Sequence, residues 1–145
     1  MQIKLAIELV PSTSWFKNLR SELTASKWDI LRKKCYSNAG YKCEICGGQG
    51  HKHPVECHEI WEYDEETRIQ TLKGLQALCP KCHRCKHIGF WEMKGYEDDI
   101  RKHMMKINGW SAQQYKTYRL SVYAQYHNRS ELNWNPDITW LKGNI

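Results

Sequence analysis

Two Cys-x-x-Cys pairs constrain this chain more than any other feature of its sequence. Cys43 and Cys46 form the first pair and Cys79 and Cys82 the second, and the segment between them is long enough for a β-hairpin. Cysteines at this spacing in a tight turn present both thiolates to one ion, and tetrahedral zinc takes four such ligands. The alternative, four unrelated buried cysteines, leaves the double pairing unexplained. We therefore expect a structural Zn²⁺ site that joins the two pairs.

Length and cysteine usage limit the class of protein. A chain of 145 residues suits one domain. We divide this domain, 1–145, into an N-terminal strand and helix (1–40), a zinc-knuckle core (41–90) and a C-terminal helical extension (91–145). Seven cysteines without a secretory signal favour metal binding in a reducing compartment over disulfides, so we expect a cytoplasmic protein. No apolar run approaches the roughly 18 residues of a membrane span, and we expect no membrane association.

Periodicity along the chain predicts the α+β class. Alternating apolar residues indicate strands, and apolar residues spaced three or four apart between capping residues indicate helices. We expect a strand or extended arm over 3–9, a helix over 26–38 with Ser26 as its N-cap, a hairpin over 55–78, a short helix from Pro80 to His87 that Gly89 ends, helices over 97–107 and 112–128, the second capped by Ser111, and an extended tail over 133–141.

Histidines near the second cysteine pair predict a second metal site. His83 and His87 are four residues apart and share one face of the predicted helix. On the first predicted strand, His58 would face the start of this helix and supply a third nitrogen. The alternatives are that one helix histidine joins the zinc site or that both are exposed. His51 and His53 are other choices for the third position, but they lie in a predicted loop.

The order of these motifs resembles the zinc-bearing branch of the HNH endonucleases. The resemblance covers 43–87, and it rests on the first cysteine pair, the strand Cys57-His58-Glu-Ile-Trp, a return strand, and Cys-x-x-Cys-His-x-x-Lys-His87. It implies a small treble-clef or ββα-metal centre with flanking helices that holds one catalytic divalent ion and hydrolyses phosphodiester bonds of DNA. By position, it implies that His58 is the general base and that His83, with His87 and Cys57, binds Mg²⁺, Mn²⁺, Ni²⁺ or Zn²⁺.

Two positions depart from the pattern of that family. Gly74 stands where the family has an Asn, and a glycine has no side chain to make the hydrogen bond of that Asn. Cys57 stands where the family has Asp or His, and a thiolate is a poor partner for magnesium. Both departures favour an alternative hypothesis, a catalytically degenerate HNH-like zinc module that binds nucleic acid or a protein partner. A third hypothesis, a redox or metal sensor that uses Cys57 and Cys85, requires an exposed thiol of low pKa.

The charge balance is compatible with a polyanionic partner. Lys and Arg number 22 against 16 Asp and Glu, a net charge of +6. DNA is the partner that we expect, and Lys81, Arg84 and Lys86 are candidates for phosphate contacts because they flank the predicted helix histidines. The alternative for these three side chains is a solvated helix face. The sequence makes no prediction of oligomeric state.

Overall fold

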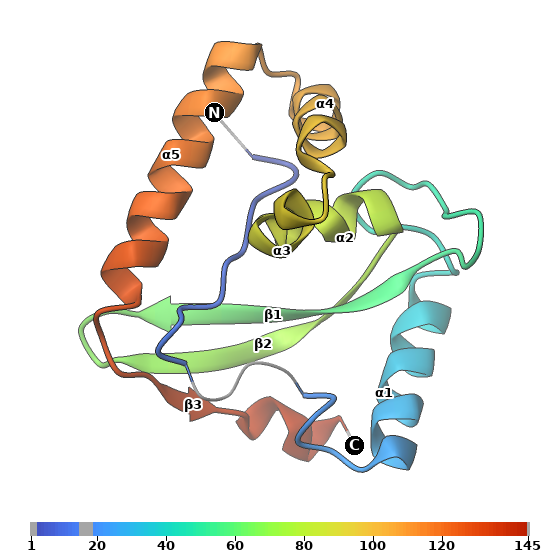
Figure 1. Cartoon of the computed structure of the whole chain (residues 1–145). Helices are drawn as coiled ribbons and strands as arrows, with labels where there is room; N and C mark the ends of the chain where they lie inside the picture. Colours follow the sequence, from blue (N-terminus) through green and yellow to red (C-terminus); the bar gives the residue numbers. More distant parts are fainter. Residues whose placement is uncertain (1–2, 15–18, 145) are drawn as a thin grey trace.

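A short three-stranded sheet with flanking helices organises the chain (Figure 1). The computed structural model describes residues 3–14 and 19–144. In this part of the chain the predicted α+β class is confirmed, and none of its helices is long and apolar enough to cross a bilayer. In chain order the elements are α1 (Ala25–Asn38), β1 (Glu56–Asp64), β2 (Ile69–Leu78), α2 (Pro80–Lys86), α3 (Ile88–Met93), α4 (Glu97–Asn108), α5 (Ala112–Arg129), β3 (Asn135–Asp137) and the 3-10 helix η1 (Thr139–Gly143).

Strands β1 and β2 form the predicted hairpin. They pair antiparallel, from Glu56 opposite Leu78 to Asp64 opposite Ile69, with one register shift midway. The Asp64 carboxylate caps the turn by accepting two backbone hydrogen bonds. The tail, expected to be extended, adds the short strand β3 parallel to β2 and then turns into η1. The sheet therefore has the order β1–β2–β3, with β1 at one edge and β3 at the other.

The N-terminal arm, residues 3–14, is extended but contains no strand. Its predicted alternation holds at Leu5 and Ile7, which are buried in the core, but not at Ile3, which is exposed. The backbone of the arm forms hydrogen bonds with side chains of two helices instead of with a neighbouring strand. Asn108 of α4 accepts from the Leu5 N–H and donates to the Leu5 carbonyl, at 2.9 and 3.0 Å, and the Tyr118 hydroxyl of α5 accepts from the Ile7 N–H at 2.9 Å. The arm thus runs between α5 and the α2–α3 pair down to the sheet (Figure 1).

Two predicted helix boundaries are wrong, and one is confirmed. Thr24, not Ser26, caps α1, because the Thr24 hydroxyl accepts from the Lys27 N–H at 3.3 Å and Ser26 already lies inside the helix. Gly89 lies inside α3, since the break after α2 falls at His87, whose backbone is not helical. Ser111 caps α5 as predicted and forms a complete capping box.

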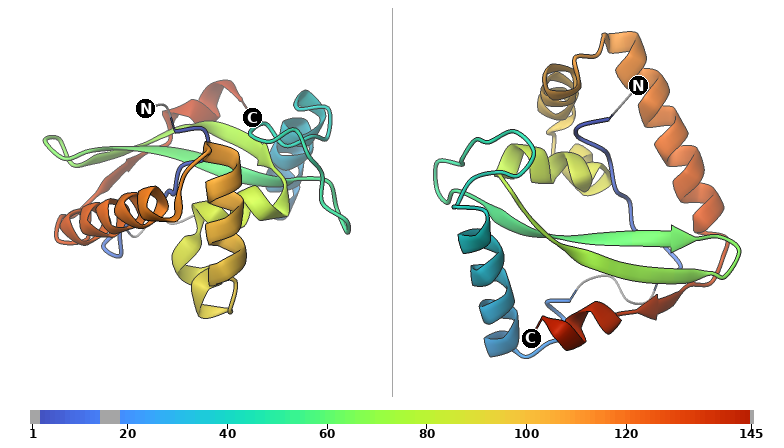
Figure 2. Two further views of the ribbon diagram at one scale, coloured as in Figure 1. Left: turned by 90° about the horizontal axis from the view of Figure 1, so that it is seen from above. Right: turned by 180° about the vertical axis from the view of Figure 1, so that it is seen from behind.

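Two apolar clusters hold the elements on either side of the hairpin. Helices α2 to α5 gather beyond β1, whereas α1 and the C-terminal segment lie toward β2 and β3 (Figures 1 and 2). The first cluster joins the arm to α2–α5, and Leu5, Leu78 and Met104 are fully buried in it. The second packs α1, β2 and η1 around Leu31 and Leu72. The paired cysteines lie within the first cluster, so the predicted zinc site forms part of the core.

Candidate metal centres

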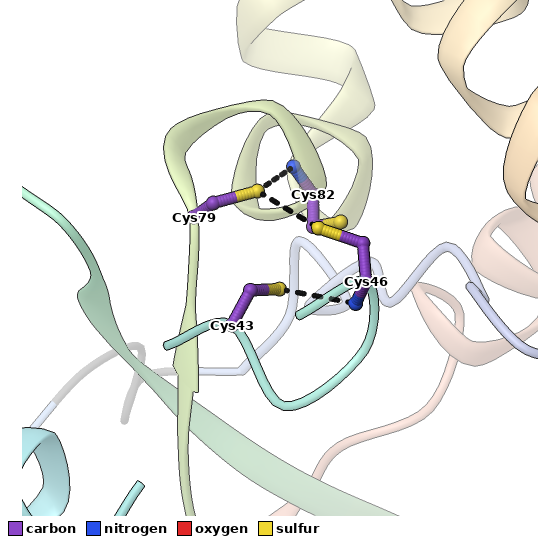
Figure 3. Close-up of side chains that lie close together, drawn as sticks. All are labelled: Cys43, Cys46, Cys79 and Cys82. Atoms are coloured by element: carbon purple, nitrogen blue, oxygen red, sulfur yellow. Dashed lines mark hydrogen bonds between the residues drawn. The ribbon is translucent and has the colours of Figure 1, made fainter. Parts of the chain in front are cut away.

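Four thiols meet where the loop after α1 approaches the end of β2 (Figure 3). Cys43 and Cys46 lie in that loop, whereas Cys79 caps α2 and Cys82 lies in its first turn. Their sulfurs lie within 4.8 Å of one another, and those of Cys46 and Cys79 are 3.6 Å apart. An ion with four Zn–S bonds of about 2.3 Å in tetrahedral geometry separates its sulfurs by about 3.8 Å. This cysteine cluster could therefore hold a metal such as zinc.

Backbone N–H groups point at the sulfurs of the cysteine cluster. The N–H of Cys46 lies 3.5 Å from the Cys43 sulfur, that of Cys82 lies 3.5 Å from the Cys79 sulfur, and that of Gly48 lies 3.3 Å from the Cys46 sulfur. The contacts among the thiols lower the pKa of Cys43 but raise those of Cys79 and Cys82, so the backbone donors are the groups that favour thiolates across the cluster. Donors aimed at a sulfur favour the thiolate, which is the form that binds metal.

His103 of α4 adjoins the cysteine cluster, and sequence reasoning missed it. Its Nε2 lies 3.2 Å from the sulfur of Cys82. A ring N–H at this distance would stabilise the thiolate and fix its orientation, as outer partners of metal ligands do. No motif connects His103 with the cysteines, because only the packing of α4 on α2 brings the ring to the sulfur.

A second group, three histidines, lies between β1 and α2. His58 comes from β1, and His83 and His87 come from α2 and the residue after it; one nitrogen of each ring lies within 4.8 Å of the others. The Nε2 atoms of His83 and His87 are 3.2 Å apart. Two nitrogens bound at about 2.0–2.1 Å to one tetrahedral ion would be about 3.3–3.4 Å apart. The structure thus brings together the three histidines singled out in the sequence, and we call them the histidine cluster.

Glu8 of the N-terminal arm holds the His58 ring. One carboxylate oxygen of Glu8 accepts from His58 Nε2 at 3.1 Å, and the other accepts from the Lys86 ammonium. Burial raises the pKa of Glu8, but the hydrogen bond with His58 and the charge of Lys86 outweigh it and lower the pKa to about 2. Glu8 is therefore an anion at neutral pH that fixes one ring of the histidine cluster.

Glu56 fixes the His83 ring, as Glu8 fixes that of His58. Its carboxylate accepts from His83 Nδ1 at 2.9 Å and from His53 Nε2 at 2.7 Å. The hydrogen bond from His83 lowers the pKa of Glu56 to about 2. With Nδ1 engaged, the Nε2 of His83 is the atom directed at His87. His53 thus contacts the histidine cluster through Glu56 and is not a member of it.

Burial keeps two rings of the histidine cluster, those of His58 and His87, neutral. It lowers the pKa of His58, and it lowers that of His87 to about 3 together with repulsion from His83 and His58. A metal ligand needs the lone pair of a neutral imidazole, so both rings are in the binding form at neutral pH.

The two positions that depart from the HNH pattern lie outside the histidine cluster. Cys57 packs against Cys35 of α1, because successive strand residues face opposite sides of a sheet and His58 faces α2. The hydrogen bond with Cys35, and burial, raise the pKa of the Cys57 thiol. Gly74 pairs with Ile60, and a Cβ there would stand 3.8 Å from the Trp140 ring nitrogen. The structure therefore does not bring Cys57 to the three histidines that it was predicted to join.

A cavity of about 820 Å³ opens onto the histidine cluster and extends around the β1 edge of the sheet. The arm contributes Glu8 to its wall, α3 contributes Phe90, and α5 contributes Tyr126 and Arg129. Glu59 also lines it, but both of its oxygens already accept hydrogen bonds, from the Leu19 N–H and the Trp61 ring N–H. The predicted ligands thus stand in the wall of a space large enough for a small substrate.

The predicted phosphate contacts separate into two places. Lys86 is buried, with 4% of its surface exposed, and pairs with Glu8 inside the fold. Lys81 and Arg84 instead line a hollow of about 380 Å³ between α2 and α4. The other basic side chains of this hollow are Lys102, His103 and Lys106. We call it the basic hollow.

Comparisons of the chain with protein-family models, curated proteins and solved structures find no match. The inference of function therefore rests on the chemistry of the two clusters and of the cavity between the arm, β1 and α5.

Proposed function

We propose that this chain is a metal-dependent endonuclease of the HNH type that hydrolyses phosphodiester bonds of DNA in the cytoplasm. The observation that carries the proposal is the histidine cluster, whose ligand nitrogens converge from β1 and α2 within 4.8 Å. In this proposal the hairpin and α2 form a treble-clef, ββα-metal unit. Zinc in the cysteine cluster would fasten the start of that unit to its helix.

The surroundings of the histidine cluster support a catalytic metal rather than a chance grouping. Glu8 and Glu56 each fix one ring through a hydrogen bond, and such carboxylate–histidine pairs are typical of metal ligands. Nitrogen ligands of this kind suit Zn²⁺ and Ni²⁺ better than Mg²⁺ and Mn²⁺, which prefer oxygen. Among the four ions expected from the sequence, we therefore favour Zn²⁺ and Ni²⁺ over magnesium and manganese.

In the proposed reaction, the residues of the cavity have separate roles. A divalent ion, when bound, supplies the Lewis acidity that stabilises charge on the phosphate. His87 presents a neutral nitrogen, because burial lowers its pKa to about 3, and Glu56 holds the ring of His83 in place. Arg129 lines the same cavity; its Nε donates to Glu65 at 2.6 Å, and its terminal N–H groups can meet a second phosphate of the strand.

His58 has two candidate roles, which the resemblance and the geometry assign differently. The resemblance makes it the general base, but its ring centre lies 5.2 and 5.3 Å from those of His83 and His87, which supports a third metal ligand. If His58 is a ligand, His58→Ala weakens cobalt binding as well as cleavage. If it is the base, His58→Ala abolishes cleavage and leaves cobalt affinity unchanged.

The proposal is tested by cleavage of supercoiled plasmid with zinc-loaded protein across Mg²⁺, Mn²⁺, Ni²⁺ and Co²⁺. We expect cutting with at least one ion, its loss in His83→Ala, and its retention in His51→Ala, which changes an exposed loop histidine. Zinc content is measured in each variant to show that the cysteine cluster is intact. Equal cutting by His83→Ala and the unaltered chain would contradict the proposal.

The alternative is a binding module that keeps the zinc-held fold and has lost catalysis. The positions of Gly74 and Cys57, both outside the histidine cluster, favour it. A redox sensor is less consistent with the structure, because Cys85 is fully buried and burial raises its pKa to about 12. DNA or protein binding without cutting by any of the four ions would support the binding module.

A further inference from the structure

The histidine cluster is recessed, and this limits the shape of what can reach it. His58 is 3% exposed, and Glu8 of the arm lies against it. The arm passes between α5 and the α2–α3 pair (Figures 1 and 2), and the arm, α2, α3 and α5 all contribute residues to the lining of the cavity. A site that reads a DNA duplex projects into a groove, and even the major groove is only about 12 Å wide. A recessed site has the opposite shape.

Aromatic rings from four elements line the cavity. They come from separate elements: Trp28 from α1, Trp61 and Tyr63 from β1, Phe90 from α3 and Tyr126 from α5. Phe90 is 57% exposed, although a large apolar side chain is normally buried. Rings at the surface of a polar site are platforms on which unpaired bases stack, and every base offers such a face.

Two arginines line the cavity, beside the carboxylates of Glu8 and Glu59, and offer guanidinium groups to a phosphate backbone. Arg20 is exposed, and Arg129 donates through Nε to Glu65 at 2.6 Å, which leaves its terminal N–H groups for a phosphate. The Arg129 guanidinium lies 4.9 Å from the centre of the Tyr63 ring, so a cation and a ring are presented together. A cavity of about 820 Å³ is in the range that encloses a small ligand, about 300–1,000 Å³, and suits a short stretch of one strand.

We propose that the cavity binds an unpaired DNA strand, so that the substrate of this chain is single-stranded or locally opened DNA rather than continuous duplex. The proposal rests on the proposed function, because it names the substrate class of the same site. Bases stack on the cavity rings, with Phe90 at the entrance, and the backbone passes the histidine cluster. Duplex DNA enters the cavity only where its two strands are separated.

Binding is measured first, without any added ion for the histidine cluster, so that the result does not depend on cleavage. The probes are a fluorescent 12-nucleotide strand, the same strand in a duplex, and a duplex with a central unpaired bubble. We expect the zinc-loaded chain to bind the single strand and the bubble at least tenfold more tightly than the duplex, by anisotropy at one salt concentration. Equal or tighter binding of the duplex would overturn the inference.

Phe90→Ala and Met93→Ala form a matched pair on α3. Met93 is 88% exposed and does not line the cavity, whereas Phe90 does. Loss of one stacked base should weaken single-strand binding roughly 5- to 150-fold in Phe90→Ala. Met93→Ala should bind as the unaltered chain does. If Phe90→Ala and Met93→Ala bind the single strand with equal affinity, the Phe90 ring does not stack on a base, and the inference is overturned.

Cleavage of the same three probes separates this inference from the proposed function. If the duplex and the single strand are cut at equal rates, the proposed nuclease function is supported and the inference about single-stranded DNA is overturned. Tight, Phe90-dependent binding of the single strand without cutting by any ion supports the inference about the cavity and overturns the nuclease.

Discussion

The ion pair between Glu8 and Lys86 is the sharpest test of how the arm is attached to the fold. Lys86 is 4% exposed, and its ammonium donates to the Glu8 carboxylate, which also accepts from His58. In Glu8→Gln the shape is kept, but a buried ammonium loses its countercharge. Removing one partner of a buried pair is strongly destabilising, because the other charge remains in a poorly solvated place.

Two routes give the size of the effect. Breaking a buried ion pair costs about 3–5 kcal/mol. Independently, the pKa of Glu8 falls from 4.5 to about 2 on folding, and one pKa unit corresponds to about 1.4 kcal/mol, which gives about 3 kcal/mol. Since 31% of the Glu8 side chain is exposed, solvent screens part of the interaction, and we expect a loss of about 2–3 kcal/mol in the free energy of unfolding.

The assay is urea unfolding of zinc-loaded protein followed by tryptophan fluorescence. Glu62→Gln is the control, because Glu62 and Lys73 form an exposed pair at 3.9 Å and its loss should cost under about 1 kcal/mol. Glu8→Gln combined with Lys86→Met removes both charges and should recover most of the loss. Equal stability of Glu8→Gln and Glu62→Gln would refute the reasoning.

The same pair gives a pH dependence. The pKa of Glu8 is lower in the folded chain than in the unfolded chain, so its contribution is complete above about pH 4.5 and is lost as the pH falls toward 2. The stability difference between the unaltered chain and Glu8→Gln should therefore shrink over that interval. A difference that stays constant from pH 5 to pH 2.5 would exclude the low pKa.

Three further predictions concern the metal centres and the basic hollow. Glu56→Gln should weaken cobalt binding at the histidine cluster about 10- to 100-fold in a spectroscopic titration, because it loosens the His83 ring; unchanged affinity would count against that role. The melting temperature should rise with free zinc in the unaltered chain and in Cys85→Ser but not in Cys82→Ser, because only Cys82 belongs to the cysteine cluster. Lys81→Ala should reduce the slope of log affinity for DNA against log salt by about 1, whereas Lys116→Ala on α5 should leave it unchanged.

Local patterns in the sequence predicted the parts of the fold that local chemistry determines. The spacing of the cysteines predicted a cluster that the structure brings together, and alternation predicted the hairpin that carries His58. Ser111 was identified as a helix cap from its residue type and place, and the capping box that it forms is complete within four residues. In each case the interacting groups are close in sequence or belong to one regular element.

The groups that the sequence did not reveal act over long distances along the chain. Glu8 reaches His58 only because the arm is held by α4 and α5, and no pattern in 3–9 distinguishes this carboxylate from a solvated one. His103 approaches Cys82 through the packing of α4 on α2. The separation of Cys57 from His58 could have been predicted, because adjacent residues of a strand face opposite sides, but the family pattern suggested that both reach one metal.

The most direct test of the account is the location of bound metal in crystals of zinc-loaded protein soaked with Co²⁺. Anomalous difference maps at the zinc and cobalt edges should show zinc among the four cysteines and cobalt among His58, His83 and His87. Cobalt there, within about 2.3 Å of the three ring nitrogens, is the result that we expect. Zinc in the cysteine cluster with no cobalt peak between β1 and α2, at a concentration that saturates cobalt binding in solution, would contradict a second metal centre.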